Sequence, residues 1–367
     1  MKKILITSNN YYNLFNFRLS LIKLLADQKK YEIYLCAKKD KFIEHIKFKK
    51  INYLHLNSKD RSYNLFQNLF TILDYKKFLK KYSFDFVLSF TIKPNLFLCF
   101  LKFFYDFKLI ITLTGLGDIF LNDKNILNIV VKKLYLKLML NADYIFCHNQ
   151  HDVDLLLSLN SKLKNKISYI DGSGINLKKY KYSPIKFPNK NIFLMPSRII
   201  KNKGVIEFIQ SCTLLEEEFP GKCKYLICGD NYVESNFNSI FENALKNSPV
   251  LYLGFKANLS HYIANANCIV LPSYREGLSK VLLESLSIGR PIIASDVPGC
   301  NNLVINNKNG FLVNPRDTNS LYLGMKKILL LDDKSLNDFS LFSKKHSAKF
   351  DENIVLYNYI KILKVSL

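Results

Sequence analysis

The feature that most constrains the fold is a strand–loop–helix–strand unit in residues 267–299. The apolar run 267–271 is rich in β-branched residues and has the length of a buried parallel strand. A helix is expected to begin just after Gly277 and to end at Gly289, and a second buried strand follows over 291–294. The loop before the helix lies at the carboxyl end of the first strand, which is where doubly wound sheets bind ligands.

Two carboxylates frame this loop, Glu276 before the helix and Glu284 in its second turn. Four backbone amides between them have no acceptor inside the helix, and such a helix N-terminus suits an anion such as phosphate. The flanking carboxylates suit sugar hydroxyls on either side of a phosphate. The simpler alternative is that Glu276 is only a charge at the helix N-terminus and that Glu284 is a solvated surface residue. The four amides belong to Gly277, Leu278, Ser279 and Lys280.

The residues around the two carboxylates carry a family resemblance. Glu276 and Glu284 lie within Pro-Ser-Tyr-x-Glu-Gly, Leu-Glu-Ser and Asp-x-Pro-Gly, and this set is similar to the motifs of the retaining glycosyltransferases of family 4. The resemblance implies an α/β protein of GT-B fold, in which two Rossmann-like domains with doubly wound parallel sheets face a cleft. It also implies that Glu276 touches the donor sugar and Glu284 the ribose of its nucleotide.

Two further segments of the second half fit the same resemblance. Arg198 and Lys203 offer a guanidinium fork and an ammonium point charge before a helix start. Such basic residues are common on surfaces. However, an Arg that is followed, after four intervening residues, by Lys-Gly is also the pyrophosphate-binding pattern of the family. The segment of Gly254, Phe255 and Lys256 resembles the one whose backbone holds the nucleotide base, with an ordinary turn at Gly254 as the alternative.

The first half of the chain holds the residues expected on the acceptor side. The loop after the first strand includes Asn10 but lacks the glycines that family members often have there. Arg18 is either a substitute anion contact or an exposed helix residue. Gly115 and Gly117 follow a strand and permit close backbone approach of a ligand. Their Thr-Gly-Leu-Gly pattern resembles a subgroup that builds bacterial surface and lipid-linked glycans.

Neither a metal site nor a catalytic histidine is predicted. His148, Asn149 and His151 are spaced loosely enough for metal ligation, but no cysteine or carboxylate arrangement completes such a site, so a strand-end loop is favoured. The family resemblance implies a reaction without metal or cofactor. The eight cysteines are scattered singly, mostly in apolar runs, which indicates buried free thiols in a reducing cytoplasm.

The length of 367 residues fits two domains. We predict an N-terminal acceptor-binding domain over residues 1–172, a linker over 173–190 and a nucleotide-sugar-binding domain over 191–349. A closing helix within 350–367 should cross back onto the N-terminal domain, as the resemblance implies.

The net charge of +23 is concentrated in residues 1–180, which hold 30 Lys and Arg against 14 Asp and Glu. Nucleic acid and an anionic membrane surface are both possible targets of such a field. The motif residues lie in the less basic half, and Lys dominates over Arg, which argues against a nucleic-acid partner.

One amphipathic helix is expected over residues 64–82 and either packs into the core or lies on a membrane interface. The aromatic run 97–105 would join it there. No segment is long and apolar enough to span a bilayer. The end of the helix carries the basic cluster Lys76, Lys77, Lys80 and Lys81.

Together these features predict a cytoplasmic, retaining hexosyltransferase attached peripherally to the inner face of a bacterial cytoplasmic membrane. It would move a hexose or N-acetylhexosamine from a UDP-sugar to a lipid-diphosphate-linked or growing glycan in polysaccharide biosynthesis. Glu276, Arg198 and Lys203 are the catalytic candidates. The alternatives are a non-catalytic basic protein that binds membrane or nucleic acid, and a GT-B epimerase or phosphorylase.

Overall fold

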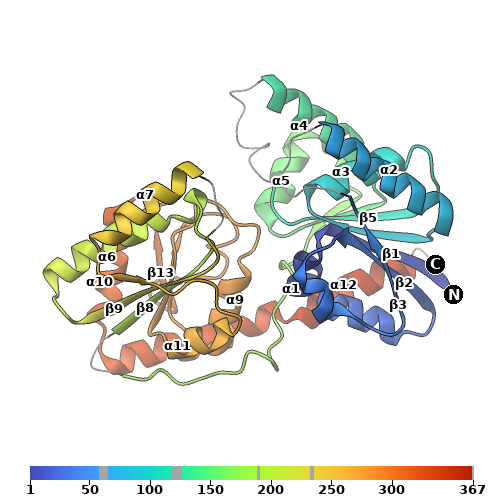
Figure 1. Cartoon of the computed structure of the whole chain (residues 1–367). Helices are drawn as coiled ribbons and strands as arrows, with labels where there is room; N and C mark the ends of the chain where they lie inside the picture. The colour runs from blue at the N-terminus through green and yellow to red at the C-terminus, as the bar shows by residue number, and fades with distance from the viewer. Residues whose placement is uncertain (58–64, 117–125, 188–190, 232–234, 366–367) are drawn as a thin grey trace. The chain divides into compact units, whose positions relative to one another are not determined.

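The structure is a computed structural model that describes residues 1–57, 65–116, 126–187, 191–231 and 235–365. These residues form two compact units (Figure 1). Unit 1 comprises Met1–Ser173 and Asn353–Leu367, and unit 2 comprises Gly174–Glu352. Among the described residues, no helix combines the length and the hydropathy that a bilayer-spanning segment needs.

Unit 1 is built on a parallel sheet whose described strands run in the order β3-β2-β1-β4-β5-β6-β7. The order reverses between β1 and β4, so the switch point of this doubly wound sheet lies between those two strands. Apart from the two edge strands, which are partly exposed, its strands are apolar and mostly buried, as parallel strands covered on both faces require. They are β1 (Lys2–Asn10), β2 (Tyr31–Lys38), β3 (Ile51–His55), β4 (Phe86–Phe90), β5 (Lys108–Leu113), β6 (Tyr144–Cys147) and β7 (Ile167–Tyr169).

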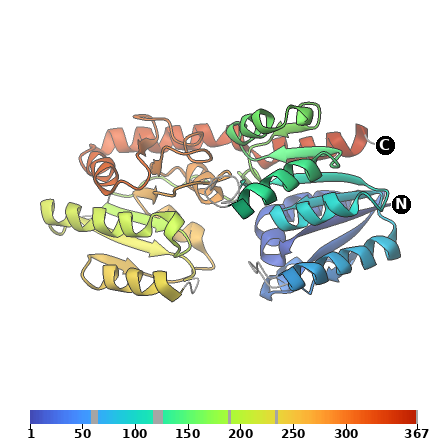
Figure 2. The same cartoon turned by 90° about the horizontal axis from the view of Figure 1, so that it is seen from above.

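Helices cover both faces of the first sheet. α1 packs on one face together with α12, the red helix that ends beside the C label in Figure 2, and Tyr359 and Leu363 of α12 are fully buried there. α2, α3, α4 and α5 pack on the other face. The helices are α1 (Tyr11–Asp27), α2 (Leu65–Tyr82), α3 (Ile92–Leu101), α4 (Ile126–Met139), α5 (Gln150–Leu159) and α12 (Glu352–Val365), with short 3₁₀ turns η1 (Lys41–Ile46) and η3 (Ser161–Leu163).

Unit 2 repeats this architecture with a second parallel sheet, ordered β10-β9-β8-β11-β12-β13. Its switch point lies between β8 and β11, where Cys268 pairs with Phe193 and Ile269 with Leu194. The strand and loop predicted around residue 271 therefore stand at this switch point. The strands are β8 (Asn191–Pro196), β9 (Cys223–Cys228), β10 (Val250–Tyr252), β11 (Cys268–Leu271), β12 (Ile292–Ser295) and β13 (Gly310–Val313).

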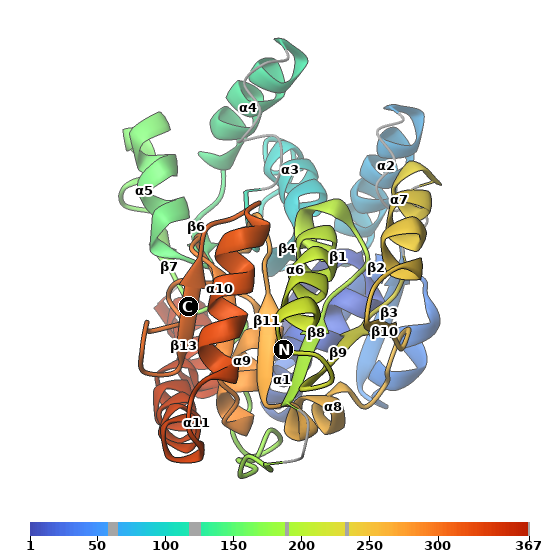
Figure 3. The same ribbon diagram turned by 90° about the vertical axis from the view of Figure 1, so that its left-hand side faces the viewer.

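The helices of unit 2 also divide between two faces. α6, α7 and α10 pack on one face (Figure 3), and α8 and α9 on the other. Gly289 takes the left-handed conformation that ends α9, as the sequence predicts. The helices are α6 (Val205–Glu218), α7 (Ser235–Lys246), α8 (Leu259–Asn265), α9 (Lys280–Ile288), α10 (Thr318–Leu329) and α11 (Asp333–Ser347), with 3₁₀ turns η4 (Lys201–Lys203) and η5 (Ala348–Phe350).

Residues 174–187, expected to be part of a linker, pack within unit 2. The amide of Ile175 donates to the carbonyl of Phe350 at 2.8 Å, and Ile185 is buried in the unit's core. Gly174 has φ +64°, and a Cβ there would lie 2.4 Å from the Cα of Glu352. A glycine is needed because the first and last segments of unit 2 meet at this point.

Candidate active site

The candidate site of unit 2 lies at the adjoining carboxyl ends of β8 and β11. Arg198 stands two residues beyond β8 and is exposed, while Lys203 ends the turn η4 that follows. Glu276 stands in the loop after β11. Because β8 and β11 are neighbours at the switch point, residues more than 70 positions apart are brought to one edge of the sheet.

Lys203 and Glu276 form an ion pair at this edge. The Nζ of Lys203 contacts Oε1 of Glu276, and the hydroxyl of Ser273 donates to the same oxygen at 2.8 Å. The two charged side chains are only 18% and 14% exposed, so solvent screens their attraction less than it would at a surface. The pair joins the diphosphate-binding candidate to the sugar-binding candidate.

Close backbone packing holds the loops that carry this pair. Gly204 has φ +71°, and a Cβ there would lie 2.2 Å from the carbonyl oxygen of Pro272. Gly299 has φ +81°, and its Cβ would lie 2.4 Å from the carbonyl of Gly277. Side chains at either position would push the loops apart, so both glycines are required by close approach as well as by backbone conformation.

The N-terminus of α9 differs in one respect from the sequence-based expectation. Ser279 is its N-cap, with its hydroxyl accepting from the amide of Leu282 at 3.5 Å. The amide of Ser279 donates to the carbonyl of Gly299 at 3.1 Å, so it is not a free anion donor as expected. The side chain of Leu278 packs into the core beside α9. A long-range contact to the Asp-x-Pro-Gly loop has thus taken one of the four amides.

Glu284 is 9% exposed and lies within α9. Burial raises the pKa of its carboxyl, and Lys280, Tyr180 and Lys179 oppose that shift. A carboxylate withdrawn from water accepts hydroxyl hydrogen bonds more strongly than a solvated one. The burial excludes the alternative that Glu284 is a solvated helix residue.

The segment expected to hold the nucleotide base follows β10. Gly254 has φ +68°, with open space around the position of a Cβ, and its carbonyl accepts from the amide of Gly229 at 3.0 Å. Phe255 is 47% exposed, and Nζ of Lys256 lies 5.8 Å from the ring centre of Tyr262. This segment lies at the same edge of the sheet as Arg198.

The corresponding edge of unit 1 contains a buried cation. Arg18 is 2% exposed, its guanidinium carbon lies 4.2 Å from the ring centre of Phe90, and its Nη2 lies 3.3 Å from Nε2 of His148. Burial lowers the pKa of Arg18, and burial beside Arg18 holds the pKa of His148 well below its usual value. The alternative that Arg18 is an exposed helix residue is therefore wrong. Its partner His148 was not foreseen, since 130 positions separate the two residues.

Asn10 and Gly115, two further acceptor-side candidates, also lie at strand ends of unit 1. Asn10 is the N-cap of α1, and its Oδ1 accepts from the amide of Asn13 at 3.0 Å. Gly115 follows β5 with φ +136°, and Gly117 lies outside the described residues. Thr91 follows β4 with φ +75°, a strained conformation for a β-branched residue, and strain of this kind gathers at functional sites.

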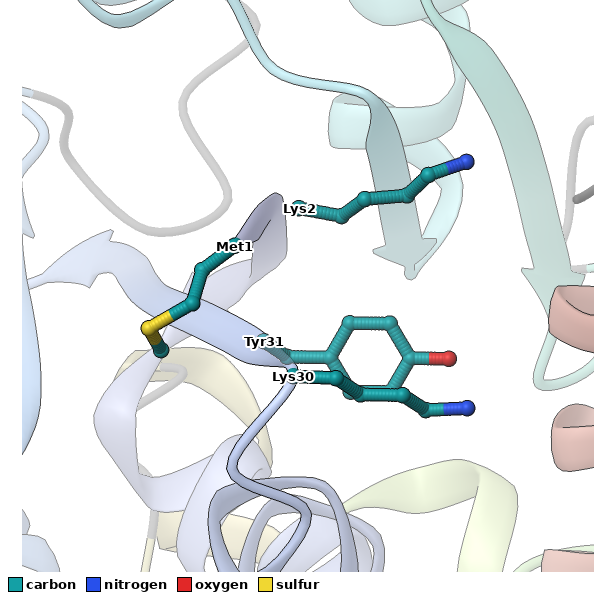
Figure 4. A pocket seen from close by; sticks show the side chains of 4 residues that line it. All are labelled: Met1, Lys2, Lys30 and Tyr31. Atoms are coloured by element: carbon teal, nitrogen blue, oxygen red, sulfur yellow. The ribbon is translucent and has the colours of Figure 1, made fainter.

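A pocket lined by Met1, Lys2, Lys30 and Tyr31 lies elsewhere (Figure 4). Lys2 begins β1 and pairs in register with Tyr31, the first residue of β2. The pocket is thus at the amino ends of these strands. Ligands of doubly wound sheets bind outside the carboxyl ends, so we do not assign a function to it.

The prediction that the cysteines are buried and free is confirmed for all eight of them. Among the described residues, no group of three or more His, Cys, Asp or Glu side chains is placed to hold a metal ion. His151 is exposed and lies 3.9 Å from the carboxylate of Asp152, while His148 is turned to Arg18.

The fold is that of GT-B glycosyltransferases. A HepE structure from Anabaena in complex with UDP-glucose superposes with a TM-score of 0.81 at 16% identity and covers 100% of both chains. Sucrose-phosphate synthase from Thermosynechococcus elongatus gives a TM-score of 0.80 at 18% identity, over 99% of this chain and 98% of its own. These similarities confirm the predicted fold class.

The sequence comparisons show similarity to glycosyltransferases. Residues 178–346, which make up most of unit 2, match the family model described as glycosyl transferases group 1. N,N'-diacetylbacillosaminyl-diphospho-undecaprenol alpha-1,3-N-acetylgalactosaminyltransferase from Campylobacter jejuni is 28% identical over 95% of both chains. N-acetylgalactosamine-N,N'-diacetylbacillosaminyl-diphospho-undecaprenol 4-alpha-N-acetylgalactosaminyltransferase of the same organism is 24% identical over 91% of this chain and 92% of its own. The predicted resemblance to lipid-linked glycan glycosyltransferases is confirmed.

Proposed function

We propose that this chain is a glycosyltransferase that moves a sugar from a UDP-sugar to an undecaprenyl-diphosphate-linked glycan in bacterial polysaccharide biosynthesis. The observation that carries the proposal is the Lys203–Glu276 ion pair at the switch point of unit 2, formed from the segment after β8 that also contains Arg198. The full-length similarity to transferases whose names specify undecaprenyl-diphosphate acceptors supports the acceptor class. UDP and UDP-glucose bound in the HepE structures support the donor class.

In the proposed reaction, the bond between the sugar's anomeric carbon and the β-phosphate oxygen of UDP breaks while a bond to the acceptor oxygen forms. Arg198 and Lys203 stabilise the negative charge that develops on the departing diphosphate. Glu276 accepts hydroxyl hydrogen bonds from the sugar, and Glu284 from the ribose. The acceptor hydroxyl's proton passes to the leaving phosphate oxygen, so the new bond forms on the face from which UDP departs and the anomeric configuration is retained.

This scheme assigns the charge stabilisation to protein side chains rather than to a metal. The nucleotide base lies against the backbone of the Gly254–Phe255–Lys256 segment, and the amides of Gly277, Leu278 and Lys280 face the phosphates. In unit 1 the acceptor diphosphate meets the edge that holds Arg18, Asn10 and Gly115.

The test is turnover with a defined donor and acceptor. UDP-N-acetylgalactosamine, UDP-galactose and UDP-glucose are each offered with a synthetic polyprenyl-diphosphate-linked sugar, and the product is analysed by mass spectrometry and NMR. We expect one donor to give a product with an α linkage and activity to persist in EDTA. Absence of transfer from all three donors, with the folded protein failing to bind UDP, would overturn the proposal.

We also propose that unit 1 attaches to an anionic membrane surface at the inner face of the cytoplasmic membrane. The helices α2, α3 and α4 lie on the same side of the first sheet (Figure 1). These helices and the turn after α3 expose apolar side chains, and α2 also exposes basic ones. The exposed apolar residues are Leu69, Phe70, Leu73, Phe100, Phe103, Phe104, Val130 and Leu134.

The basic cluster completes the amphipathic character of α2. Lys76, Lys77 and Lys80 lie on the exposed face that also carries Leu69 and Leu73, whereas Tyr75 and Leu79 point into the core. Some apolar residues of α2 therefore pack in the core, whereas others are exposed on the surface. The aromatic run 97–105 is also split, because Phe97 is buried while Phe103 and Phe104 are 62% and 68% exposed.

Charge and apolar contact give this attachment a distinctive salt dependence. Each Lys near an anionic surface contributes about 1 kcal/mol, which salt screens, whereas inserted Phe side chains contribute independently of salt. We expect binding to phosphatidylglycerol vesicles that salt weakens but does not abolish. Replacing Lys76, Lys77, Lys80 and Lys81 by Gln should reduce vesicle binding and activity on a lipid acceptor, but not on a short water-soluble acceptor. Unchanged vesicle binding would show that the cluster is only a solvated helix face.

A further inference from the structure

The candidate active site contains a set of contacts that the proposed reaction leaves unused. Lys203 and Glu276 are paired in the structure, yet the proposed reaction assigns both of them other partners. Once Lys203 turns to the diphosphate, the pair no longer fixes one loop against the other. The relative position of the two loops then depends on other contacts.

Tyr274 supplies those contacts between the two loops. Its amide donates to the carbonyl of Asn202 at 3.0 Å, and its hydroxyl donates to Oε1 of Glu207 at 2.5 Å. Tyr274 lies two residues before Glu276, and Glu207 lies in the first turn of α6, directly after the loop of Lys203. The side chain of Tyr274 therefore connects the sugar-binding loop to the helix that follows the diphosphate-binding loop.

Arg316 joins from a third loop, between β13 and α10. Its guanidinium carbon lies 4.8 Å from the ring centre of Tyr274, within the range of a cation–π contact. It reaches this place with φ +62°, an uncommon conformation for a residue other than glycine, just before Asp317 caps α10. This uncommon backbone conformation therefore occurs at the residue whose guanidinium contacts the ring of Tyr274.

The carboxylate of Glu207 relies on its hydrogen bond with Tyr274. Its Oε2 is buried and has no hydrogen-bond partner among the described residues, so Tyr274 is its side-chain partner there. A carboxylate in the first turn of a helix is favoured by the helix dipole, which offsets part of its desolvation. Burial, followed by the bond to Glu207, raises the pKa of Tyr274, so the hydroxyl remains a donor at neutral pH.

We propose that Tyr274, Glu207 and Arg316 form a strut that positions Glu276 against the Lys203 loop while the sugar is transferred. This inference rests on the proposed function. None of the three residues need touch the substrate, and Tyr274 acts through Glu276. The strut keeps the sugar-binding carboxylate in place after its ion pair with Lys203 has opened.

The chain offers a matched control at the other end of α6. The hydroxyl of Tyr322 donates to Glu218, and Lys326 pairs with the same carboxylate while lying 5.9 Å from the Tyr322 ring centre. This group has the same composition of tyrosine, glutamate and cation. Glu218 is the last residue of α6, whereas Glu207 stands in its first turn, so the control lies away from the candidate site.

The test compares Tyr274→Phe with Tyr322→Phe, each of which removes one hydroxyl. For Tyr274→Phe we expect kcat to fall about tenfold while the donor KM and the UDP Kd change less than about threefold, as displacement of a reacting group predicts. Tyr322→Phe should match the parent. Glu207→Gln, which keeps an acceptor for the hydroxyl, should be more active than Glu207→Ala. Equal kcat in the two Phe variants, or a loss in Tyr274→Phe confined to KM, would overturn the strut.

A second measurement does not depend on turnover. Amide hydrogen exchange in the 200–204 and 272–276 loops should accelerate together in Tyr274→Phe and in Arg316→Asn, and not in Tyr322→Phe. Asn is chosen because it tolerates left-handed backbone while it removes the cation. Unchanged exchange in Tyr274→Phe would overturn the strut. If the parent transfers no sugar yet the two loops loosen together, the proposed function fails and the coupling of the loops remains.

Discussion

Both units carry charged side chains at the carboxyl ends of their strands, but the two units differ in how these charges are paired and buried. In unit 2, Lys203 and Glu276 neutralise one another and remain partly exposed. In unit 1, Arg18 is fully enclosed, with a neutral histidine and the ring of Phe90 around its guanidinium. Among the described residues, Arg18 forms no ion pair with a carboxylate.

This difference indicates how each edge can serve a negatively charged ligand. A paired lysine can exchange its partner when a diphosphate binds, so the ammonium of Lys203 can turn from Glu276 to the ligand. The enclosed guanidinium of unit 1 cannot turn outward without unpacking, and it acts as a fixed positive charge beneath the strand ends. We infer that unit 2 contacts its ligand directly, whereas unit 1 sets a potential around Asn10 and Thr91.

The largest expected effect comes from the carboxylates of unit 2. We expect kcat/KM to fall roughly 100-fold for Glu276→Ala and roughly tenfold for Glu284→Ala, because hydroxyl contacts that strengthen in the transition state are lost. Steady-state assays at saturating acceptor give these ratios. Neither change removes an apolar core side chain, so the melting temperature should stay close to that of the parent. Full activity of both variants with unchanged melting would contradict the glycosyltransferase assignment.

The next effect separates phosphate contacts from base contacts in unit 2. Arg198→Ala and Lys203→Ala should each weaken UDP binding by about 1.5 kcal/mol or more, roughly tenfold, since a charge-assisted contact is lost. Uridine has no phosphate, so its affinity should hardly change. Titration calorimetry with both ligands tests this, with Lys201→Ala as a nearby basic control. Equal losses for UDP and uridine would mean that these side chains do not contact phosphate.

A smaller effect is expected at the fixed charge of unit 1. Arg18→Met keeps the length of the side chain but removes the buried cation, and such exchanges are often neutral or stabilising. We expect an unchanged or higher melting temperature together with an acceptor KM raised several-fold, and an unaltered UDP affinity. A variant that melts early and has normal acceptor kinetics would show that Arg18 serves packing alone.

The smallest effect concerns pH and the same edge. Burial beside Arg18 keeps the pKa of His148 low, so below its ordinary pKa of about 6.5 the unfolded chain binds a proton that the folded chain does not. The free energy of unfolding should therefore decrease as the pH falls, with a His148 contribution of about 1 kcal/mol at pH 6.

Denaturant melts at pH 8 and pH 6 measure this dependence. His148→Gln should flatten it, whereas His151→Gln, which alters an exposed side chain, should not. His55 and His346 also have lowered pKa values, and burial raises that of Glu284, so the comparison is between variant and parent. Identical pH dependence in the parent and His148→Gln would show that His148 accepts a proton without penalty.

Local patterns predicted most of the sheet architecture. The expected strand over 267–271 matches β11 within one residue, and that over 291–294 matches β12 within one residue at each end. Strands buried on both faces stand out as short apolar runs between turn residues, and the connecting helices follow from spacing and caps. The boundary of unit 2 was less visible, because Ile175 and Ile185 are ordinary apolar residues in a polar stretch until the fold shows where they pack.

The candidate site was predictable only where a motif is contiguous. Glu276, Glu284 and the Arg198–Lys203 pair could be found because each stands in a local pattern. Contacts between distant segments left no such signal: Tyr274 with Glu207, Arg18 with His148, and the Ser279 amide with Gly299. Partner choice across a sheet is set by topology and side-chain packing, which no single stretch of sequence records.

The return of α12 to unit 1 has a consequence for the order in which the protein is made. Tyr359 packs against Phe90 and Phe146 and hydrogen-bonds Thr112, so one apolar layer of unit 1 stays incomplete until α12 has been translated. The ribosome makes the whole of unit 2 before that helix emerges. The face of the first sheet that α12 covers therefore stays exposed while unit 2 is synthesised, whereas unit 2 has all of its own segments as soon as it has been made.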